Sequence, residues 1–456
     1  MRSFNPATDR LLGTFALHSA EEVTQRLQRA AMAQRAWAGT SALQRVPLLL
    51  RTAEVLRARQ STLASLVTCE MGKPLRESLG EIEKCAWNVA FYAKEGPTFL
   101  ADQVVASSAS DSRVVYDPIG PVLAVMPWNY PFWQVMRAAA PVLMGGNALV
   151  LKHASNVPQC ALALEEVFRD AGWPEGLFTT LLVDSPRVAG LIRDERIAAV
   201  TFTGSTPVGR AIAAQAGQAL KKQVLELGGS DPFIVLADAD VEAAAAAAVQ
   251  ARFANTGQSC ISSKRFIVEH PVAERFVEAF LEGVRALVMG DPMQEATTVG
   301  SMASRALRDE LHAQVCASVA EGARPLIGGR PVEGAGAFYQ PTILDHVTPA
   351  MTVARQETFG PAAAVLRVSG VEEALQVANG TEFGLGAALW TRDLDRAAQL
   401  ARRIEAGAVF VNGLVASDPR LPFGGTKQSG YGRELGSFGL REFMNIKTVW
   451  TGPVRT

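Results

Sequence analysis

One cysteine stands in a context that suits nucleophilic chemistry. Cys260 follows the segment Asn255–Ser259, whose glycine and polar residues suit an exposed turn better than a sealed core. A thiolate in a cleft could attack a carbonyl carbon there, so we expect Cys260 to be an accessible nucleophile with a low pKa. The other four cysteines lie in helical, largely apolar contexts that favour structural roles: Cys69, Cys85, Cys160 and Cys316.

Two further segments offer a base and an oxyanion donor. Glu226 follows an apolar stretch and precedes Gly228 and Gly229. A carboxylate held near apolar walls has a raised pKa and could activate water, although a solvated strand-end glutamate is the plainer alternative. Asn129, in the segment Met126–Pro131, could donate to a developing oxyanion, or it could simply satisfy the backbone of a Pro-rich turn.

The segment Phe202–Gly209 could bind an anion. A strand end, a glycine and a helix start would direct free backbone N–H groups toward a group such as a pyrophosphate. It lacks the usual G-x-G-x-x-G pattern, so the signal is weak by itself. Two other segments are a polar turn at Gln356–Pro361 and a Gly-rich loop at Pro422–Gly430.

The elements that position these residues alternate between strand and helix. Apolar spacing predicts three N-terminal helices, at Glu21–Trp37, Ser41–Glu70 and Leu75–Tyr92. Short apolar runs then alternate with helical stretches, in one series from Val122 to Phe202 and in a second from Phe233 to Val411. This order favours two doubly wound α/β domains joined near Leu225–Gly229, with ligands at the carboxyl ends of the strands.

Two segments fit neither series. Gln103–Tyr116 alternates weakly, and Arg441–Val454 is a short strand-like tail. They could form a small sheet that pairs across subunits, or they could be edge strands of the two main sheets.

Composition narrows the classes of function. The 456 residues carry 44 Lys and Arg against 45 Asp and Glu, so no basic excess points to nucleic acid. No apolar run reaches the about 20 residues that a membrane span needs, and we expect a cytoplasmic protein with no membrane partner. The five cysteines and five histidines show no metal-ligand spacing, so no protein-bound metal is expected.

Taken together, these six segments make the chain resemble the NAD(P)-dependent aldehyde dehydrogenase superfamily. They occur in the same order as the family's motifs and at close to the same spacing, and the resemblance covers the whole chain. The separation of Glu226 from Cys260 is specific to that family. Within it, the chain is most similar to bacterial succinate-semialdehyde dehydrogenases, in particular to a shorter subgroup with the signature Lys152-His153-Ala154.

The resemblance implies the catalytic roles. Cys260 would attack the aldehyde to give a thiohemiacetal, Asn129 and the Cys260 N–H would form the oxyanion hole, and Glu226 would activate water for thioester hydrolysis. It also implies cofactor contacts, at Met126, Pro127, Trp128, Lys152, Ser155, Thr203, Gly204, Ser205, Gly209, Leu227, Glu357 and Phe359.

The resemblance does not decide whether the cofactor is NAD or NADP. Three residues after Lys152, many NAD-preferring relatives have a glutamate that binds the adenosine ribose, and this chain has Ser155. Without that carboxylate a 2′-phosphate is not repelled, which permits NADP. Alternatively, Ser155 only caps a helix and NAD is preferred.

The substrate contacts follow the family incompletely. The resemblance places Arg137, Ser417 and Phe423 at the substrate, with Arg137 as one of two arginines that hold a distal carboxylate. Ala254 replaces the second arginine. Three other cations could replace the lost charge: Arg252, Lys264 and Arg420.

The implied function is NAD(P)-dependent oxidation of succinate semialdehyde to succinate. Glutarate semialdehyde or an aromatic aldehyde is the alternative substrate, and the CoA-acylating relatives lack the glutamate present here as Glu226. The implied domains are a Rossmann-type cofactor domain (1–102 and 119–226), a catalytic domain (227–415) and a small β oligomerisation element (103–118 and 436–456). A homodimer or homotetramer follows from the same resemblance.

Overall fold

The computed structural model describes residues 1–452. It opens with a hairpin that the sequence patterns did not predict, β1 (Arg2–Phe4) with β2 (Leu11–Thr14). Helices α1 (Ala20–Ala38) and α2 (Ala42–Ala58) each begin with a serine capping box, at Ser19 and Ser41.

The helix expected over Ser41–Glu70 is wrong as a single element. The chain leaves helical geometry at Arg59 (φ −101°, ψ 9°), which separates α2 from α3 (Gln60–Met71). The Arg59 guanidinium pairs with Glu166 and Asp170 of α6 (Pro158–Asp170) at 3.0 and 2.7 Å. Helix α4 (Leu75–Phe99) then runs past the predicted end at Tyr92.

The first main sheet has six strands in the order β19-β9-β8-β5-β6-β7, parallel except for the antiparallel pair of β19 with β9. Its strands are β5 (Pro121–Met126), β6 (Ala148–His153), β7 (Phe178–Thr180), β8 (Ala199–Thr203), β9 (Lys222–Glu226) and β19 (Gly430–Tyr431). The helices that follow its strands are α5 (Trp133–Met144), α6, α7 (Val188–Arg193) with the 3-10 turn Ser185–Arg187, and α8 (Thr206–Gln218).

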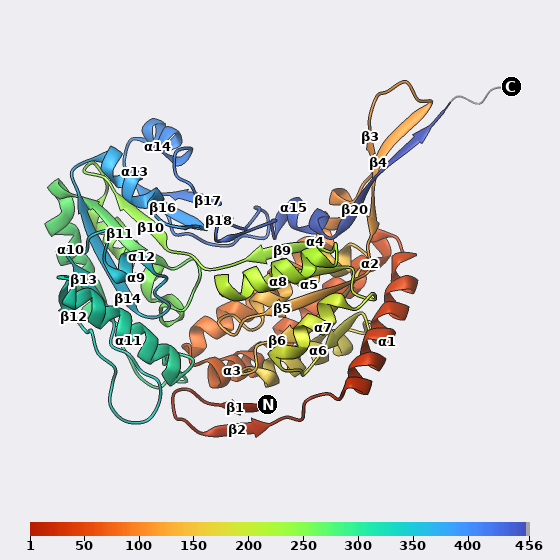
Figure 1. Cartoon of the computed structure of the whole chain (residues 1–456), viewed down its shortest axis with the longest axis horizontal. Coiled ribbons are helices and arrows are strands. Elements are labelled where there is room, and N and C mark those ends of the chain that lie inside the picture. Colours follow the sequence, from red (N-terminus) through yellow and green to blue (C-terminus); the bar gives the residue numbers. More distant parts are fainter. Residues whose placement is uncertain (453–456) are drawn as a thin grey trace.

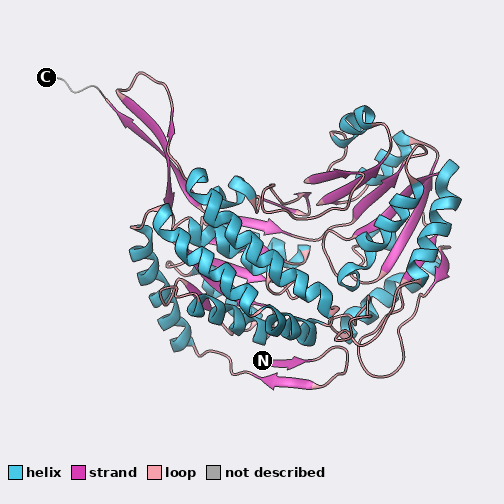
Figure 2. Ribbon diagram, turned by 180° about the vertical axis from the view of Figure 1, so that it is seen from behind, coloured by secondary structure: helices cyan, strands magenta, loops and turns pink. Residues whose placement is uncertain are grey.

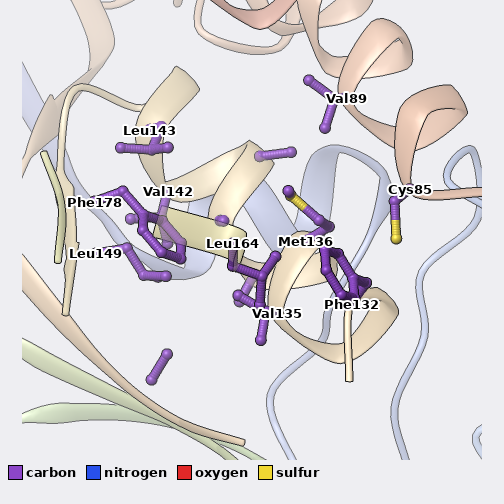
Figure 3. Close-up of a cluster of buried hydrophobic side chains, with 14 of the residues drawn as sticks. Cys85, Val89, Phe132, Val135, Met136, Val142, Leu143, Leu149, Leu164 and Phe178 are labelled. Atoms are coloured by element: carbon purple, nitrogen blue, oxygen red, sulfur yellow. The ribbon is translucent and has the colours of Figure 1, made fainter. Parts of the chain in front are cut away.

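Both faces of this sheet are buried, because alternate strand residues point to opposite sides. Val122 and Ala124 pack with α2 to α6, in the core whose side chains Figure 3 shows around Phe132 and Leu164. Leu123 instead packs against α1, α7 and α8 on the other face.

The second main sheet has seven strands in the order β12-β13-β14-β11-β10-β16-β17, and only β12 with β13 is antiparallel. Its strands are β10 (Asp231–Val235), β11 (Ser263–Glu269), β12 (Arg324–Ile327), β13 (Thr342–Asp345), β14 (Ala362–Val368), β16 (Gly386–Trp390) and β17 (Ala408–Val411). Helices α9 (Val241–Phe253) and α10 (His270–Arg285) cover one face. The other face carries α11 (Arg305–Ala320), α12 (Thr352–Arg355), α13 (Val371–Asn379) and α14 (Leu394–Ala401), and Figure 2 shows this layering from behind.

A separate three-stranded sheet extends away from both main sheets (Figure 1). It consists of β3 (Gln103–Val104), β4 (Asp111–Pro118) and β20 (Met444–Thr451), in the order β20-β4-β3. The short helix α15 (Gly436–Glu442) directly precedes β20. The alternative of edge strands is therefore wrong. Residues 453–456 of the expected oligomerisation element lie outside the described residues.

The chain crosses between the main sheets twice. It leaves β9 at Glu226 for β10, and later returns through β18 (Thr426–Lys427), which pairs with β15 (Phe383–Gly384), to reach β19. The two crossings touch: Leu227 N donates to Ser429 O at 3.0 Å, and Ser429 Oγ donates to Gly228 O at 2.6 Å. Within residues 1–452, no helix has the length and apolar character needed to cross a membrane.

Candidate active site

The loop before Cys260 has an unusual backbone. Asn255, Thr256 and Gly257 are consecutive residues with φ of +56°, +55° and +70°. Asn255 Nδ2 donates to the carbonyls of Asn129 (3.1 Å) and Gln258 (2.8 Å), which fixes the turn against the end of β5. A left-handed run of this kind is costly for non-glycine residues and persists only where the surroundings impose it.

Cys260 lies where two cavities meet. One, of about 240 Å³, is lined from the first sheet by Trp128 and Ser205 and from the second by Glu357, among others. The other, of about 340 Å³, is lined by Arg137 and Ser417, among others. Cys260 and Gln134 line both cavities, so the sulfur can be approached from two sides.

Burial raises the pKa of the Cys260 thiol well above 9.0, and the Glu226 carboxylate raises it further. This direction is opposite to the low pKa that we expected for Cys260. A nearby base must take its proton before the sulfur can attack a carbonyl.

Glu226 ends β9 and is buried, with 1% exposure. Its Oε2 accepts from Arg137 Nη2 at 3.1 Å, whereas Oε1 has no hydrogen-bond partner among residues 1–452. The carboxylate lines the same cavity as Cys260. It therefore keeps one oxygen available to accept a proton.

Asn129 follows β5 and is also buried. Its amide donates to Gln258 O at 3.1 Å, and because an amide carries two N–H donors, the second remains for another acceptor. The backbone carbonyl of Asn129 accepts a hydrogen bond from Lys73 Nζ at 3.2 Å. The buried Lys73 pairs with Glu81.

Glu81 also caps the helix that follows Asn129. Its Oε1 accepts from the backbone N–H groups of Phe132 and Trp133 at 2.8 and 2.9 Å, at the start of α5. The pair of Lys73 and Glu81 thus fixes Asn129 from one side and α5 from the other. The sequence reasoning missed both residues.

The first cavity contains most of the residues expected to contact a cofactor. It is lined by the expected residues Pro127, Trp128, Thr203, Gly204, Ser205, Leu227, Glu357 and Phe359. Ser205 precedes α8 without capping it by its side chain, which leaves first-turn N–H groups for an anion. Gly209 lies against Leu227, where a Cβ would come within 2.4 Å of the leucine side chain.

The side chain of Glu357, which also lines the first cavity, is held in place by two contacts. Its Oε1 accepts from Gly229 N at 3.0 Å and lies 3.7 Å from Lys264 Nζ. Burial raises the pKa of Glu357, and the Lys264 ammonium opposes that rise. The ring of Phe359 meets Trp128 edge-on at 5.7 Å.

Besides Gly209, three expected cofactor residues do not line this cavity. Met126 is buried at the end of β5, and Lys152 is buried on the neighbouring strand β6, where burial lowers its pKa. Ser155 is exposed in the loop after β6. All three lie at the carboxyl edge of the first sheet.

The second cavity contains the expected substrate residues Arg137, Ser417 and Phe423. Arg137 is also engaged with protein carboxylates, at 3.1 Å from Glu226 and 2.6 Å from Glu434, and it lies over the Phe423 ring at 4.7 Å. Burial raises the pKa of Glu434 to about 7, against the effect of Arg137.

The three replacements considered for the missing arginine are absent from this cavity. Arg252 is buried and donates to Thr358 O at 3.1 Å, and Lys264 donates to the carbonyl of Cys260 at 2.7 Å. Arg420 is exposed and pairs with Asp418 at 2.6 Å. Those interpretations are wrong.

The cavity does contain a cation that sequence reasoning missed, Lys84 of α4. A signal existed, because Glu77, Glu81 and Lys84 are spaced by four and three residues and so share one helix face. Tyr130 and Trp133 also line this cavity and were missed.

These features define the class. Two α/β sheets, with a cysteine between two cavities and a carboxylate and an amide beside it, suit covalent chemistry on an aldehyde. The chain belongs to the aldehyde dehydrogenase family, whose model matches residues 1–449.

Individual relatives match this chain over nearly its full length. The chain is 49% identical to the succinate semialdehyde dehydrogenase [NAD(P)+] Sad of Escherichia coli (strain K12), over 98% of this chain and 97% of that protein. It is 48% identical to a probable NADP(+) succinate-semialdehyde dehydrogenase of Synechocystis sp., over 98% and 99%. The crystal structure of succinic semialdehyde dehydrogenase from Streptococcus pyogenes with NADP+ is similar at a TM-score of 0.97 and 35% identity, over 99% and 100%.

Proposed function

We propose that this protein oxidises succinate semialdehyde to succinate with NAD or NADP as the acceptor. The observation that carries the proposal is the position of Cys260 between two cavities, one with an anion-binding helix start and one with buried cations. The names of the relatives, most of which are succinate-semialdehyde dehydrogenases, support the substrate.

The first half of the reaction forms a bond to Cys260. Glu226 takes the thiol proton, and the sulfur attacks the aldehyde carbon to give a thiohemiacetal. The oxygen that becomes anionic accepts hydrogen bonds from the Asn129 amide and the Cys260 N–H. Bound NAD(P) supplies the acceptor that oxidises this carbon to the thioester.

The second half releases the acid. Once Glu226 has released the thiol proton to solvent, it takes a proton from water through its free Oε1, and the resulting hydroxide attacks the thioester carbonyl, again with Asn129 as donor. The carbon–sulfur bond breaks, succinate leaves, and Cys260 is regenerated. Aldehyde, water and NAD(P)+ thus give carboxylate, NAD(P)H and two protons.

The residues present fit a dinucleotide. The uncapped start of α8 at Ser205 offers backbone N–H groups to a pyrophosphate, and Glu357 would hold the nicotinamide ribose. Lys152 would contact the adenosine ribose, and Ser155 brings no carboxylate to repel a 2′-phosphate. We therefore propose that the protein uses both NAD and NADP.

We also propose a role for each of the three sheets. The six-stranded sheet would bind cofactor and the seven-stranded sheet would carry Cys260. The projecting three-stranded sheet would join subunits into a homodimer or homotetramer, since its Val104, Ile446 and Trp450 are 73%, 57% and 55% exposed. Five free cysteines suit a reducing, cytoplasmic setting.

A matrix of substrates and cofactors tests the proposal. The kcat/KM is measured for succinate semialdehyde, glutarate semialdehyde, butanal and benzaldehyde, each with NAD and with NADP. We expect succinate semialdehyde to exceed butanal at least about a hundredfold, which is about 2.7 kcal/mol of carboxylate recognition. Equal rates with butanal or benzaldehyde would refute this substrate and leave the family unaffected.

A further inference from the structure

The second cavity presents one ammonium without a protein counter-ion. Lys84 Nζ donates to Ser417 Oγ at 2.8 Å and lies 4.4 Å from the ring centroid of Trp133. Among residues 1–452 it forms no ion pair with a carboxylate. An ammonium has three donors, so most of its hydrogen-bonding capacity remains to be used.

Arg137, the cation expected there, is already compensated. Its guanidinium pairs with both Glu226 and Glu434 and stacks on Phe423. A substrate carboxylate at Arg137 would therefore compete with two buried protein carboxylates. Lys84 offers its charge without that competition.

The remaining charged groups leave room for an anion beside Lys84. Burial raises the pKa of Glu77, on the same helix, to about 7, so this carboxylate is only partly ionised at neutral pH. Glu81 is neutralised by Lys73. Ala254, also on the cavity wall, is short where an arginine would fill space.

On the basis of the proposed function, we infer that Lys84 and Ser417 hold the far carboxylate of the semialdehyde, in place of an arginine at position 254. The aldehyde end would then point toward Cys260, which lines the same cavity. Lys84 would thereby be a specificity-determining residue that discriminates semialdehydes from plain aldehydes.

The test compares Lys84→Met, which keeps the stem but removes the charge, with Lys84→Arg, which keeps the charge. Lys94→Met is the matched control, since Lys94 lies exposed on the same helix. For each protein, the kcat/KM for succinate semialdehyde is divided by that for butanal. Binding of succinate is measured independently by calorimetry.

We expect Lys84→Met to lower this ratio at least about tenfold, the effect of removing a hydrogen bond to a charged group. The loss should appear mainly in the KM for succinate semialdehyde, and succinate binding should weaken in parallel. Lys84→Arg should keep most of the ratio, and Lys94→Met all of it.

The outcomes separate this inference from the proposed function. If wild type prefers the semialdehyde but Lys84→Met keeps the full ratio and succinate affinity, the role of Lys84 is refuted and the substrate stands. An equal loss with both aldehydes, with succinate affinity unchanged, would mean a structural role and also refute it. If wild type itself shows no preference, the proposed substrate fails and the inference fails with it.

Discussion

Arg137 Nη2 lies 3.1 Å from Glu226 Oε2, so the arginine expected to bind substrate also holds the carboxylate expected to activate water. Both side chains are almost fully buried. The same guanidinium reaches Glu434 at 2.6 Å. One cation therefore orients the base while leaving Glu226 Oε1 free toward the cavity.

Replacing the base should stop the reaction halfway. Glu226→Gln keeps the shape but cannot take a proton, so the thioester should form slowly and hydrolyse more slowly still. We expect steady-state turnover to fall about 10²- to 10⁴-fold, the usual worth of a general base. Rapid-quench mass spectrometry should find acylated Cys260. The exposed Glu278→Gln is the control, and ordinary turnover by Glu226→Gln would exclude the role.

Removing Arg137 should destabilise the fold. Arg137→Met leaves Glu226 and Glu434 buried without their cation, which typically costs about 3–5 kcal/mol. The pKa of Glu434, already raised to about 7, rises further without the guanidinium. Protonation relieves the buried charge, so the loss in free energy of unfolding should be largest near pH 8 and shrink toward pH 5. Urea denaturation across that range measures it, and a pH-independent loss would contradict the explanation.

The KM for succinate semialdehyde should depend on the charge of Lys84. Burial and, to a smaller extent, the nearby Arg137 lower the pKa of Lys84 to about 8, while Asp418 and Glu81 oppose the change. The ammonium exists below that pKa, so this KM should rise as the pH increases through about 8. The KM for butanal should not follow, because butanal has no carboxylate.

Arginine at this position supplies the control for that pH profile. In Lys84→Arg the charge persists at alkaline pH, and the rise in KM should disappear. An unchanged rise in Lys84→Arg would assign the titration to another group of the cavity, such as Glu77 or Glu434.

A carboxylate at position 155 should select against NADP. Ser155→Glu would repel a 2′-phosphate by at least about 1 kcal/mol, so the ratio of kcat/KM for NADP to that for NAD should fall at least about fivefold. Steady-state kinetics with both cofactors measure the ratio. Ser61→Glu, on the exposed face of α3, is the control. An unchanged ratio would place the 2′-phosphate away from Ser155.

The strained loop should not tolerate a side chain at Gly257. With φ at +70°, a Cβ would lie 2.4 Å from the carbonyl oxygen of Gly360. We expect Gly257→Ala to lower the free energy of unfolding by more than about 1 kcal/mol and to impair turnover. Gly217→Ala, in open space on α8, should instead leave stability equal or higher. Thermal unfolding distinguishes the two.

Local patterns predicted much of the fold, because buried strands and amphipathic helices carry their own periodicity. The predicted second series ends at Val411, which is the last residue of β17. The break at Arg59 was not predictable, since its guanidinium finds partners more than 100 residues away on α6. The hairpin β1–β2 was not predictable because its strands, of three and four residues, are too short to show a periodic pattern.

The site was predictable where a motif lies next to its own strand end. Asn129 and Ser205 follow strands of the first sheet and Glu226 ends one, and all three line the same cavity as Cys260. Lys84 and Lys73 were missed because their partners, Ser417 and the carbonyl of Asn129, lie far away in the sequence. The thiol pKa likewise depends on burial, which the turn around Cys260 does not reveal.

The double crossing between the sheets has a mechanical consequence. Because Leu227–Gly228 and Ser429 lie side by side and hydrogen-bonded, the two halves share a two-stranded strap instead of a single tether. Two connections that are hydrogen-bonded to each other resist displacement of one sheet relative to the other more than a single connection would. Glu226 immediately precedes Leu227, so the position of its carboxylate relative to Cys260 depends on both connections.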